Sequence, residues 1–295
     1  MGENFMTIRS LEIFECVARH GKMSDAADEL YIAQPTISKA IAELEKEYGV
    51  RLFNRLSKKL FITKAGEQLL AYAQNILSTA GEMEKSMLNL SIHKTILLGA
   101  TMTVGKCVLV DIVKSFEERY PHTQIEVTID NTAVIEDMLL ASKLDIALVE
   151  GDIKSAELKV THAISDNLVL VCPKEHPLAD RGGVDIHALA SYPFILREEG
   201  SGTRETFMKE LKANDVNIYV KWSCHGFDAL LEAVLANQGL TVISKRIAEP
   251  YVLENKLCIV PLNGVEINRS FSLVHHKTKY IGSALKNLMG LILQK

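Results

Sequence analysis

The sequence lacks the features that mark several classes of protein. A membrane-spanning helix needs about 18 consecutive apolar residues, and no apolar run in this sequence approaches that length. Acidic residues Glu3, Glu12 and Glu15 interrupt the N-terminus, which argues against a signal peptide. The five cysteines form no CxxC pair and lie mostly inside apolar runs, as buried thiols of a reducing compartment do. We expect a cytoplasmic protein without a membrane partner, and leave open a minor redox role for Cys107 or Cys224.

Motifs of catalysis and metal binding are also missing. The sequence contains no HExxH, GxSxG, P-loop or GxGxxG. His275 and His276 lie in an apolar, strand-like run without a third ligand at metal spacing, so core or surface histidines are favoured. Glu198 and Glu199 are adjacent, and adjacent carboxylates rarely converge. We therefore expect no enzyme activity, no catalytic residue, no metal and no cofactor.

Length and charge set the scale of the molecule. A chain of 295 residues is about twice the usual size of a domain, so two or three domains are expected. The apolar share of 47% and the charged share of 24% are ordinary for a globular protein. The net charge of −4 argues against a chain that is basic throughout, but it leaves room for a local basic surface.

The first third of the chain has the pattern of three short helices. Residues 7–20 place apolar side chains at helical spacing, and Gly21 can end that helix. Ser24 can N-cap a second helix, and Pro35 suits the first turn of a third. Two helices with a short connection form the arrangement in which the second helix enters the DNA major groove.

The start of the third helix carries short polar side chains. Gln can bond bidentately to adenine, hydroxyls can meet bases or phosphates, and helix N-termini favour phosphate. An N-cap followed by a solvated face explains this stretch equally well when it is taken alone. The candidate DNA contacts here are Gln34, Pro35, Thr36, Ser38 and Lys39, with Ser24 on the preceding helix.

A basic segment follows this helix. Residues 51–64 contain no acid, and the alternation in "KKLFIT" with a polar turn over 54–58 predicts a hairpin wing. Residues 1–63 hold nine Lys or Arg and nine Asp or Glu, so we expect the positive charge to gather on one surface. A basic wing positions a protein on phosphates without reading sequence. The candidate phosphate contacts are Arg51, Arg55, Lys58 and Lys59.

A long helix is expected next, because residues 65–90 contain no proline. Apolar residues recur there every seven positions and form the seam of a coiled coil. The helix could instead pack on its own domain, but a narrow seam between two globular units favours pairing with a second copy. The seam comprises Leu69, Ile76, Met83 and Leu90, with Ala73, Ala80 and Met87 as its companion set.

Strands and helices alternate in the remaining two-thirds of the chain, which predicts a parallel α/β sheet. A first set runs from "TILLGA" to "LDIALVE", and a second from "DNLVLVC" to "KLCIVPL". The strand "RSFSLVHH" and a helix over 280–294 then return to the first set. We expect two lobes joined by two crossover strands, with crossings near 164–168 and 265–270.

Two stretches resemble a known family. "AADELYIAQPTISKAIAELEKEYGVRLFNR", followed by "FITKAGEQLL", is similar to the winged helix-turn-helix of LysR-type transcriptional regulators. The resemblance implies a DNA-binding regulator controlled by a small effector, a homodimer formed through the linker helix, and commonly a homotetramer. It also implies an N-terminal all-α winged helix-turn-helix and a C-terminal α/β effector domain that is two-lobed and periplasmic-binding-protein-like. The expected domains are 6–63 (DNA binding), 64–91 (linker helix) and 92–295 (effector binding), the last with lobe I at 92–165 and 268–295 and lobe II at 166–267.

Ligands of open parallel sheets bind beyond the carboxyl ends of the strands, and donor-rich loops follow four such ends here. The loop "GSGTRE" resembles that of LysR-type regulators of sulfur metabolism and carbon fixation, whose effectors tend to be small anions. We therefore expect sulfite, sulfate, a small carboxylate or phosphate, although plain helix capping explains each loop alone. The candidate effector residues are Thr101, Thr103, Asn131, Thr132, Ser201, Gly202, Thr203 and His225.

Two other functions fit parts of the pattern. Residues 92–295 suit a ligand sensor like the solute-binding proteins, without a DNA-reading role, although such a protein should be exported. The N-terminal helices also suit an interaction module that does not bind DNA. A DNA reader would be distinguished by an affinity that falls steeply with salt while its site preference persists.

Overall fold

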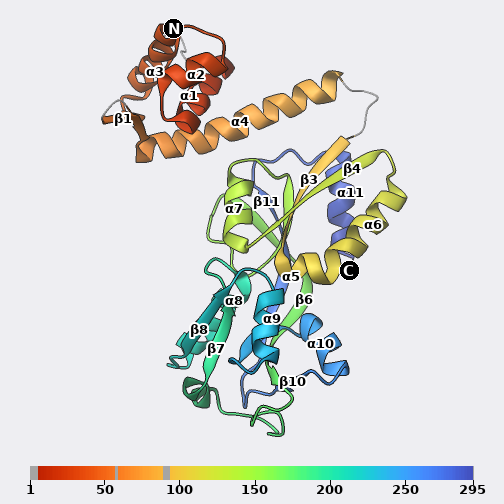
Figure 1. Cartoon of the computed structure of the whole chain (residues 1–295). Coiled ribbons are helices and arrows are strands. Elements are labelled where there is room, and N and C mark those ends of the chain that lie inside the picture. The colour runs from red at the N-terminus through yellow and green to blue at the C-terminus, as the bar shows by residue number, and fades with distance from the viewer. Residues whose placement is uncertain (1–5, 57–58, 89–93, 295) are drawn as a thin grey trace. The chain divides into compact units, whose positions relative to one another are not determined.

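A computed structural model describes residues 6–56, 59–88 and 94–294 of the chain (Figure 1). The chain divides into two compact units, which are treated separately: the residues before 93 together with 140–142, and the remainder. Lys58 of the predicted wing and Leu90 of the predicted seam lie outside the described residues, as does the side chain of Met87. Among the helices that are described, none is both long enough and apolar enough to cross a membrane.

The first unit has three short helices, a two-stranded hairpin and a long helix, as the sequence predicted. Its elements are α1 (Ile8–His20), α2 (Met23–Glu29), α3 (Gln34–Tyr48), β1 (Phe53–Leu56), β2 (Lys59–Ile62) and α4 (Lys64–Leu88). One apolar core joins the three short helices, with Phe14, Val17, Ile37 and Leu44 fully buried. Helix α1 ends at Gly21, whose φ of 65° is the left-handed conformation that glycine adopts without strain.

The predicted cap of α2 is wrong. The helix begins at Met23, so its N-cap is Lys22, and Ser24 lies one residue inside the helix. The Ser24 hydroxyl donates instead to the Asp25 carboxylate, at 2.8 Å. The half-buried Met23 side chain packs against the apolar core, which accounts for this early start.

The hairpin wing is confirmed, but its turn is shorter than predicted. Strands β1 and β2 pair antiparallel from Phe53↔Ile62 to Leu56↔Lys59, so residues 54–56 belong to a strand rather than to the turn. A Glu45 oxygen accepts the Leu52 N–H at 2.7 Å, and the Gly21 carbonyl accepts the Leu60 N–H at 2.9 Å. These bonds fix the wing to α3 and to the end of α1.

The second unit is a two-lobed α/β structure. Its main sheet has the order β10-β6-β11-β5-β3-β4, with β9 also paired to β6, and β7-β8 form a separate parallel pair. The strands are β3 (Lys94–Thr101), β4 (Thr123–Asp130), β5 (Ile146–Glu150), β6 (Leu158–Pro173), β7 (Pro193–Arg197), β8 (Tyr219–Cys224), β9 (Thr241–Ser244), β10 (Leu257–Val260) and β11 (Ile267–His276). The helices are α5 (Met102–Val104), η1 (Gly105–Leu109), α6 (Val110–Arg119), α7 (Thr132–Leu140), η2 (Ile186–Ser191), α8 (Gly202–Ala213), α9 (Asp228–Leu235), α10 (Lys245–Leu253) and α11 (Ser283–Ile292).

The main sheet is mixed rather than parallel throughout, which corrects the prediction. Strand β3 pairs parallel with β4 and β5, but β11 is antiparallel to both β5 and β6. Strands β6 and β11 are the two long crossover strands. Because they run between the lobes in opposite directions, they pair antiparallel with each other and reverse the strand direction of the sheet.

Each lobe has its own apolar core, and β6 and β11 contribute to both. Along β6, Ile164 belongs to the core that contains α6 and α11, whereas Leu168 belongs to the core around α8. Along β11, Phe271 belongs to the first core and Ile267 to the second. The change of core therefore falls within four residues on each strand.

Two helices differ from the sequence expectation. The helical segment that follows β3 begins at Met102 and contains a π-helical turn, Gly105–Leu109, before α6, and regular helical spacing does not predict such a turn. Helix α10 was missed, since Pro250 inside it is a residue that normally ends a helix.

Candidate functional site

The start of α3 presents a polar face to solvent. Gln34, Pro35, Thr36 and Lys39 are exposed and Ser38 is half-buried, whereas the apolar residues one turn apart on the other face are buried. The N-cap is Ala33, and within the described chain it makes no side-chain cap bond. Pro35 has no N–H and the Thr36 N–H donates to the Ala33 carbonyl at 2.9 Å, so within the described chain the Gln34 N–H of this turn stays available for a ligand.

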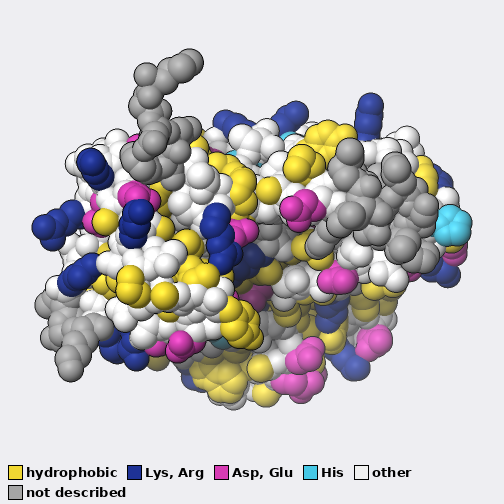
Figure 2. Space-filling model, turned by 90° about the horizontal axis from the view of Figure 1, so that it is seen from above, with side chains coloured by type: hydrophobic (Ala, Val, Ile, Leu, Met, Phe, Trp, Pro, Cys, Tyr) yellow, Lys and Arg dark blue, Asp and Glu magenta, His cyan; other side chains and the backbone are white. Residues whose placement is uncertain are grey.

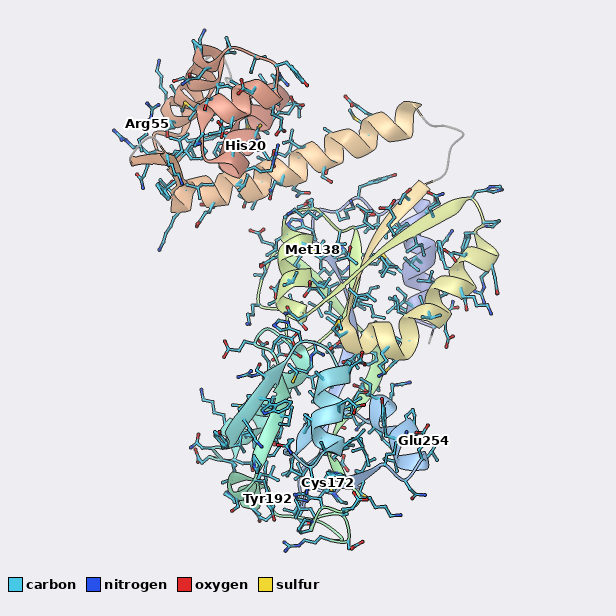
Figure 3. All side chains as sticks on the ribbon, viewed as in Figure 1. His20, Arg55, Met138, Cys172, Tyr192 and Glu254 are labelled. Carbon is cyan, nitrogen blue, oxygen red and sulfur yellow. The ribbon has the colours of Figure 1, made fainter. Side chains whose placement is uncertain are left out.

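The wing carries positive charge beside this helix. Arg51, Arg55 and Lys59 are exposed, and none of them forms an ion pair with a residue that the structure describes. Lys39 on α3 lies 3.7 Å from Glu43 but keeps 77% of its side chain exposed. Lys and Arg side chains project from this unit in Figure 2, and Figure 3 labels Arg55 at its margin.

A second set of candidate residues meets at the end of β5, around a carboxylate that the sequence analysis did not single out. Glu150 is 2% exposed. One of its oxygens accepts a hydrogen bond from the Thr101 hydroxyl and the other accepts one from the Thr103 hydroxyl, the latter at 2.8 Å. The two hydroxyls predicted to hold an effector anion thus contact a carboxylate of the protein itself.

The two lobes touch at this point, backbone against backbone. The Thr132 hydroxyl donates to the Glu150 carbonyl at 2.8 Å and accepts the Gly202 N–H at 3.2 Å. A Cβ atom on Gly202 would lie 2.2 Å from that carbonyl oxygen, so only glycine fits. Asn131 caps α7, because its side-chain oxygen accepts the Val134 N–H at 3.0 Å.

Two buried arginines lie near Glu150, each paired with its own carboxylate. Arg269 donates to Asp166 through Nε at 2.7 Å and to the Thr203 hydroxyl through Nη1 at 2.9 Å. Arg197 makes a bidentate pair with Glu198, both bonds at 2.8 Å, and its guanidinium lies 4.9 Å from the centre of the Phe227 ring. These four charged side chains are almost fully buried.

Some buried donors of this region remain unpaired. Within the described part of the chain, Arg197 Nη1, Arg269 Nη2 and the Ser201 hydroxyl have no hydrogen-bond partner. An unpaired buried donor costs about 1–3 kcal/mol, and more when it is charged. Such donors suit a bound oxyanion, which can accept several hydrogen bonds at once.

Burial and nearby charges shift the pKa values of Glu150 and Glu198. Burial raises the pKa of Glu150, although Arg269, the Thr103 hydrogen bond and Arg197 all act to lower it. Burial also acts to raise the pKa of Glu198, but the Arg197 hydrogen bonds and charge outweigh it, so this pKa is lowered. The Arg197 guanidinium thus favours the ionised form of Glu198, whereas burial disfavours the ionised form of Glu150.

The remaining candidates are His225 and two cysteines, whose side chains make no hydrogen bond to Glu150 in the described chain. His225 is exposed and acts on Glu198 through its charge. Burial raises the pKa of Cys107 to about 11 and also raises that of Cys224. Because the thiolate is the reactive form of cysteine, neither thiol is activated, and the redox role left open above loses support.

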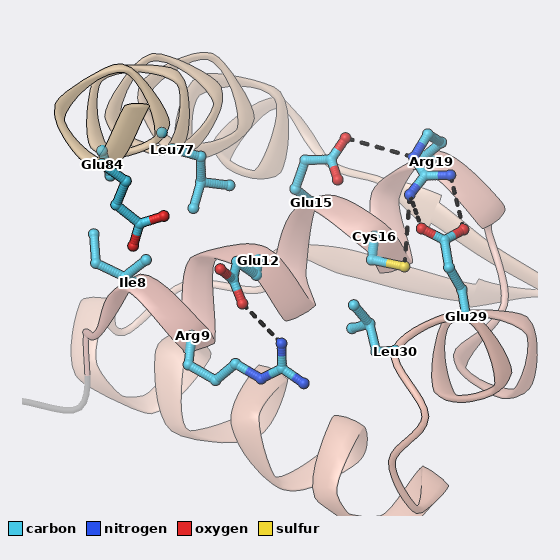
Figure 4. A pocket seen from close by; sticks show the side chains of 12 residues that line it. Ile8, Arg9, Glu12, Glu15, Cys16, Arg19, Glu29, Leu30, Leu77 and Glu84 are labelled. Carbon is cyan, nitrogen blue, oxygen red and sulfur yellow. Dashed lines mark hydrogen bonds and ion pairs between the residues drawn. The ribbon is translucent and has the colours of Figure 1, made fainter. Parts of the chain in front are cut away.

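A further hollow of about 440 Å³ lies in the first unit, between α1, α2 and α4 (Figure 4). Ligand atoms of Cys16, His20 and Glu29 lie there within 4.8 Å of one another, a spacing that a metal ion could use. The Arg19 guanidinium, however, donates to Glu29 at 3.0 Å and contacts the Cys16 sulfur. It already supplies the positive charge, so the group forms an ion-pair cluster that joins α1 to α2.

Comparison with protein families identifies the chain. Residues 8–67 match the bacterial regulatory helix-turn-helix proteins of the lysR family, and residues 91–295 match the LysR substrate binding domain. The chain belongs to the LysR family. This confirms the resemblance found in the sequence: the protein is a DNA-binding transcriptional regulator with an effector-binding domain.

Relatives align with this LysR-family regulator along its length. The uncharacterized transcriptional regulator YeiE of Escherichia coli (strain K12) is 30% identical over 284 residues, which are 96% of both chains. The RuBisCO operon transcriptional regulator of Allochromatium vinosum is 28% identical over 280 residues, 95% of this chain and 93% of its own. The second name agrees with the resemblance of the "GSGTRE" loop to regulators of carbon fixation.

Solved structures show the same fold. A full-length OxyR variant from Pseudomonas aeruginosa superposes with a TM-score of 0.70 at 18% identity, covering 98% of each chain. The regulatory domain of Synechocystis PCC6803 CcmR, in complex with 2-PG, superposes with a TM-score of 0.64 at 20% identity, covering 68% of this chain and 96% of that one. The predicted fold class is thereby confirmed.

Proposed function

We propose that the exposed start of α3 reads bases while the wing holds phosphates. The support is the uncapped first turn of α3, which presents Gln34, Thr36 and Ser38 beside three basic side chains that pair with no acid of the described chain. Lys39, Arg51, Arg55 and Lys59 then neutralise phosphates, and Pro35 shapes the first turn. Ser24 is kept as a DNA contact because it is exposed on α2. DNA is the partner, so the protein acts in the cytoplasm, as a regulator and not as an enzyme.

We further propose that a small anion binds between the lobes, close to Glu150. The observation that carries this assignment is the pair of buried arginines, each with one terminal nitrogen that makes no hydrogen bond in the described chain, together with the unpaired Ser201 hydroxyl. Thr203 positions Arg269, and Thr132 and Gly202 hold the lobes together. Sulfate, sulfite, a small carboxylate and phosphate all offer the acceptor oxygens that this donor set needs. The 2-PG complex of the CcmR domain is consistent with an effector in this fold.

The assembly is proposed to be a homodimer paired through α4, with two dimers forming a tetramer. We keep the domain limits 6–63, 64–91 and 92–295, with lobe I at 92–165 and 268–295 and lobe II at 166–267. A ligand between the lobes favours one lobe arrangement over another only by its difference in affinity for the two. The same difference then biases the spacing of the paired DNA-binding units.

The DNA assignment is tested by titrating the full chain onto operator and random DNA at several salt concentrations. Lys59→Ala should weaken both complexes alike and reduce the salt slope by about 1, since one phosphate contact is lost. Gln34→Ala should weaken only the operator complex, by about 1–3 kcal/mol. Lys286→Ala, in the effector-binding unit, is the control. Equal loss on both DNAs for Gln34→Ala would remove the base-reading role.

The effector assignment is tested by calorimetry with sulfate, sulfite, acetate and phosphate. Ser201→Ala and Arg269→Lys should each weaken the best ligand about tenfold, because each removes one donor of about 1.4 kcal/mol. Thr95→Ala, at the opposite end of β3 from Thr101, should leave the affinity unchanged. Absence of heat with every anion, or equal affinity in all three variants, would contradict the assignment.

A further inference from the structure

The buried charges around Glu150 do not balance while its carboxyl is ionised. Arg197 is matched by Glu198, and Arg269 is matched by Asp166. Glu150 itself forms no ion pair with any residue that the structure describes, and its two oxygens contact threonine hydroxyls. These five buried side chains together therefore carry one net negative charge when Glu150 is ionised and none when Glu150 is protonated.

The surroundings of Glu150 supply one further positive charge, the partly exposed Arg246, and it lies beside Asp166 rather than beside Glu150. The side chains that face it from β3 and α5 are neutral hydroxyls, and α8 adds the neutral Thr203. Strand β11 contributes Arg269 and strand β7 contributes Arg197, each already paired with a carboxylate. Strand β6 contributes Asp166, the partner of Arg269. From η1 comes the thiol of Cys107, and α10 brings Arg246, whose Nε lies 3.8 Å from Asp166 and whose side chain is 45% exposed.

Both protonation states of Glu150 can be hydrogen-bonded, so geometry does not exclude the neutral one. The Thr101 hydroxyl can donate one bond and accept two, and it already accepts the Glu150 N–H at 3.3 Å. A protonated Glu150 can therefore donate to Thr101 or to a ligand. Burial raises the pKa of Glu150, in agreement with the lack of an ion-pair partner.

An anion that enters this site would add a second negative charge beside Glu150. Two like charges in a buried site cannot both stay ionised without a large penalty, and the weaker acid takes up a proton. A protonated Glu150 would also become a donor and complement the unpaired N–H groups of Arg197 and Arg269.

We propose that the effector anion binds together with one proton, which Glu150 holds. This inference rests on the proposed anion site and adds its ligand chemistry: the site takes up an anion and a proton in a 1:1 ratio. The effector is thus bound more tightly as the pH falls. Above the pKa of Glu150 in the free protein, the affinity should fall about tenfold for each pH unit.

The experiment is a calorimetric titration of the full chain with sulfate and with acetate, because the charge of neither anion changes between about pH 6 and pH 8.5. Each pH is measured in two buffers of different ionisation enthalpy, so the heats report the protons taken up per anion. The expected results are an uptake that approaches about one proton and an affinity that falls up to about tenfold per pH unit. Glu150→Gln, a neutral isostere, should bind without proton uptake and with an affinity independent of pH.

Glu136→Gln serves as the control. It removes another buried carboxyl of the same unit, one that accepts the Lys154 and Ser155 N–H groups. This variant should keep the proton uptake of the unmodified chain. If Glu136→Gln abolishes the uptake, the proton does not reside on Glu150.

The outcomes separate this inference from the proposed function. Binding without proton uptake and without pH dependence overturns the inference and leaves the anion site standing. Absence of binding for every anion of the panel at every pH overturns both. If Glu150→Gln does not fold, the number of protons that the unmodified chain takes up per anion still tests the inference.

Discussion

Gly202 lies where the first turn of α8 passes the end of β5 too closely for a side chain. Its N–H is bound by Thr132, and a Cβ atom would lie 2.2 Å from the Glu150 carbonyl oxygen. Gly151 faces it with a φ of 88°, and a Cβ there would lie 2.6 Å from the Gly202 Cα. The contact between the lobes is therefore a backbone contact that any added methyl group would push apart.

We predict that Gly202→Ala lowers the free energy of unfolding by roughly 1–3 kcal/mol, the usual cost of overpacking. Urea denaturation of the full chain measures it. Gly290→Ala is the matched control: this glycine lies within α11, a Cβ there meets nothing within 4 Å, and alanine should stabilise the helix by about 1 kcal/mol. A Gly202→Ala protein as stable as the unmodified chain would show that the lobes separate there freely.

Individual residues also show what the sequence could and could not predict at the proposed effector site. The hydroxyls of Thr101, Thr103 and Thr132 were predicted from their place after strands, and they do meet. Their common partner, Glu150, was missed because an acid at the end of "LDIALVE" is typical of a solvent-exposed strand end. It lies 49 residues from Thr101, and Arg269 lies 66 residues from Thr203. Pairings at such separations leave no periodic signal in one sequence.

At the scale of elements, α1 and α2 are joined by charge as well as by their apolar core. Glu29 on α2 accepts hydrogen bonds from Arg19 on α1, and His20 Nε2 lies 2.6 Å from one of the Glu29 carboxylate oxygens. These bonds from Arg19 and His20 lower the pKa of Glu29 to about 2. The helix-turn-helix thus depends on one exposed carboxylate for part of its fixed geometry.

A lowered pKa stabilises the fold only while the carboxylate is ionised. Glu29→Gln should therefore be less stable than the unmodified chain at neutral pH. The difference should shrink as the pH falls below the ordinary value of 4.5 and vanish near 2. Asp28→Asn, which removes an acid one position earlier on α2 that pairs with no described residue, should show no such trend in urea denaturation at each pH. A constant difference between Glu29→Gln and the unmodified chain would mean that charge is not its source.

Helix α4 shows where a repeat predicts an element but not its partners. The seven-residue spacing correctly predicted a long helix. Within that seam, however, Leu69 and Ala73 pack into the core of the first unit, whereas Ile76 and Met83 are exposed. Tyr72, outside the predicted seam, is exposed on the same side as these two. A spacing of seven cannot tell which part of an apolar stripe faces its own domain and which part faces a second chain.

At the scale of the whole molecule, the regulator must couple an effector site in one unit to DNA contacts in the other. The net charge of −4 does not reveal this difference between the units, because exposed basic side chains lie on the wing while paired charges are buried at the proposed effector site. Exposed charges act on DNA through long-range attraction, which salt screens. Buried charges act on a ligand at short range, where salt has little effect. We therefore expect salt to weaken DNA binding much more than effector binding.

The exposed stripe of α4 is the feature on which assembly should depend. Ile76 and Met83 expose 39% and 61% of their surface, and Tyr72 exposes 53%. The double variant Ile76→Glu with Met83→Glu places like charges where two such helices would pair, and we predict that it halves the mass of the assembly in sedimentation analysis. Leu253→Glu, at an 83% exposed leucine of α10, is the control and should leave the assembly intact. A DNA-binding unit that is no longer paired through α4 engages one half-site of a two-fold symmetric operator, so the double variant should also lose operator affinity while it still binds effector. If the double variant keeps the mass of the unmodified protein, pairing through this face of α4 is ruled out.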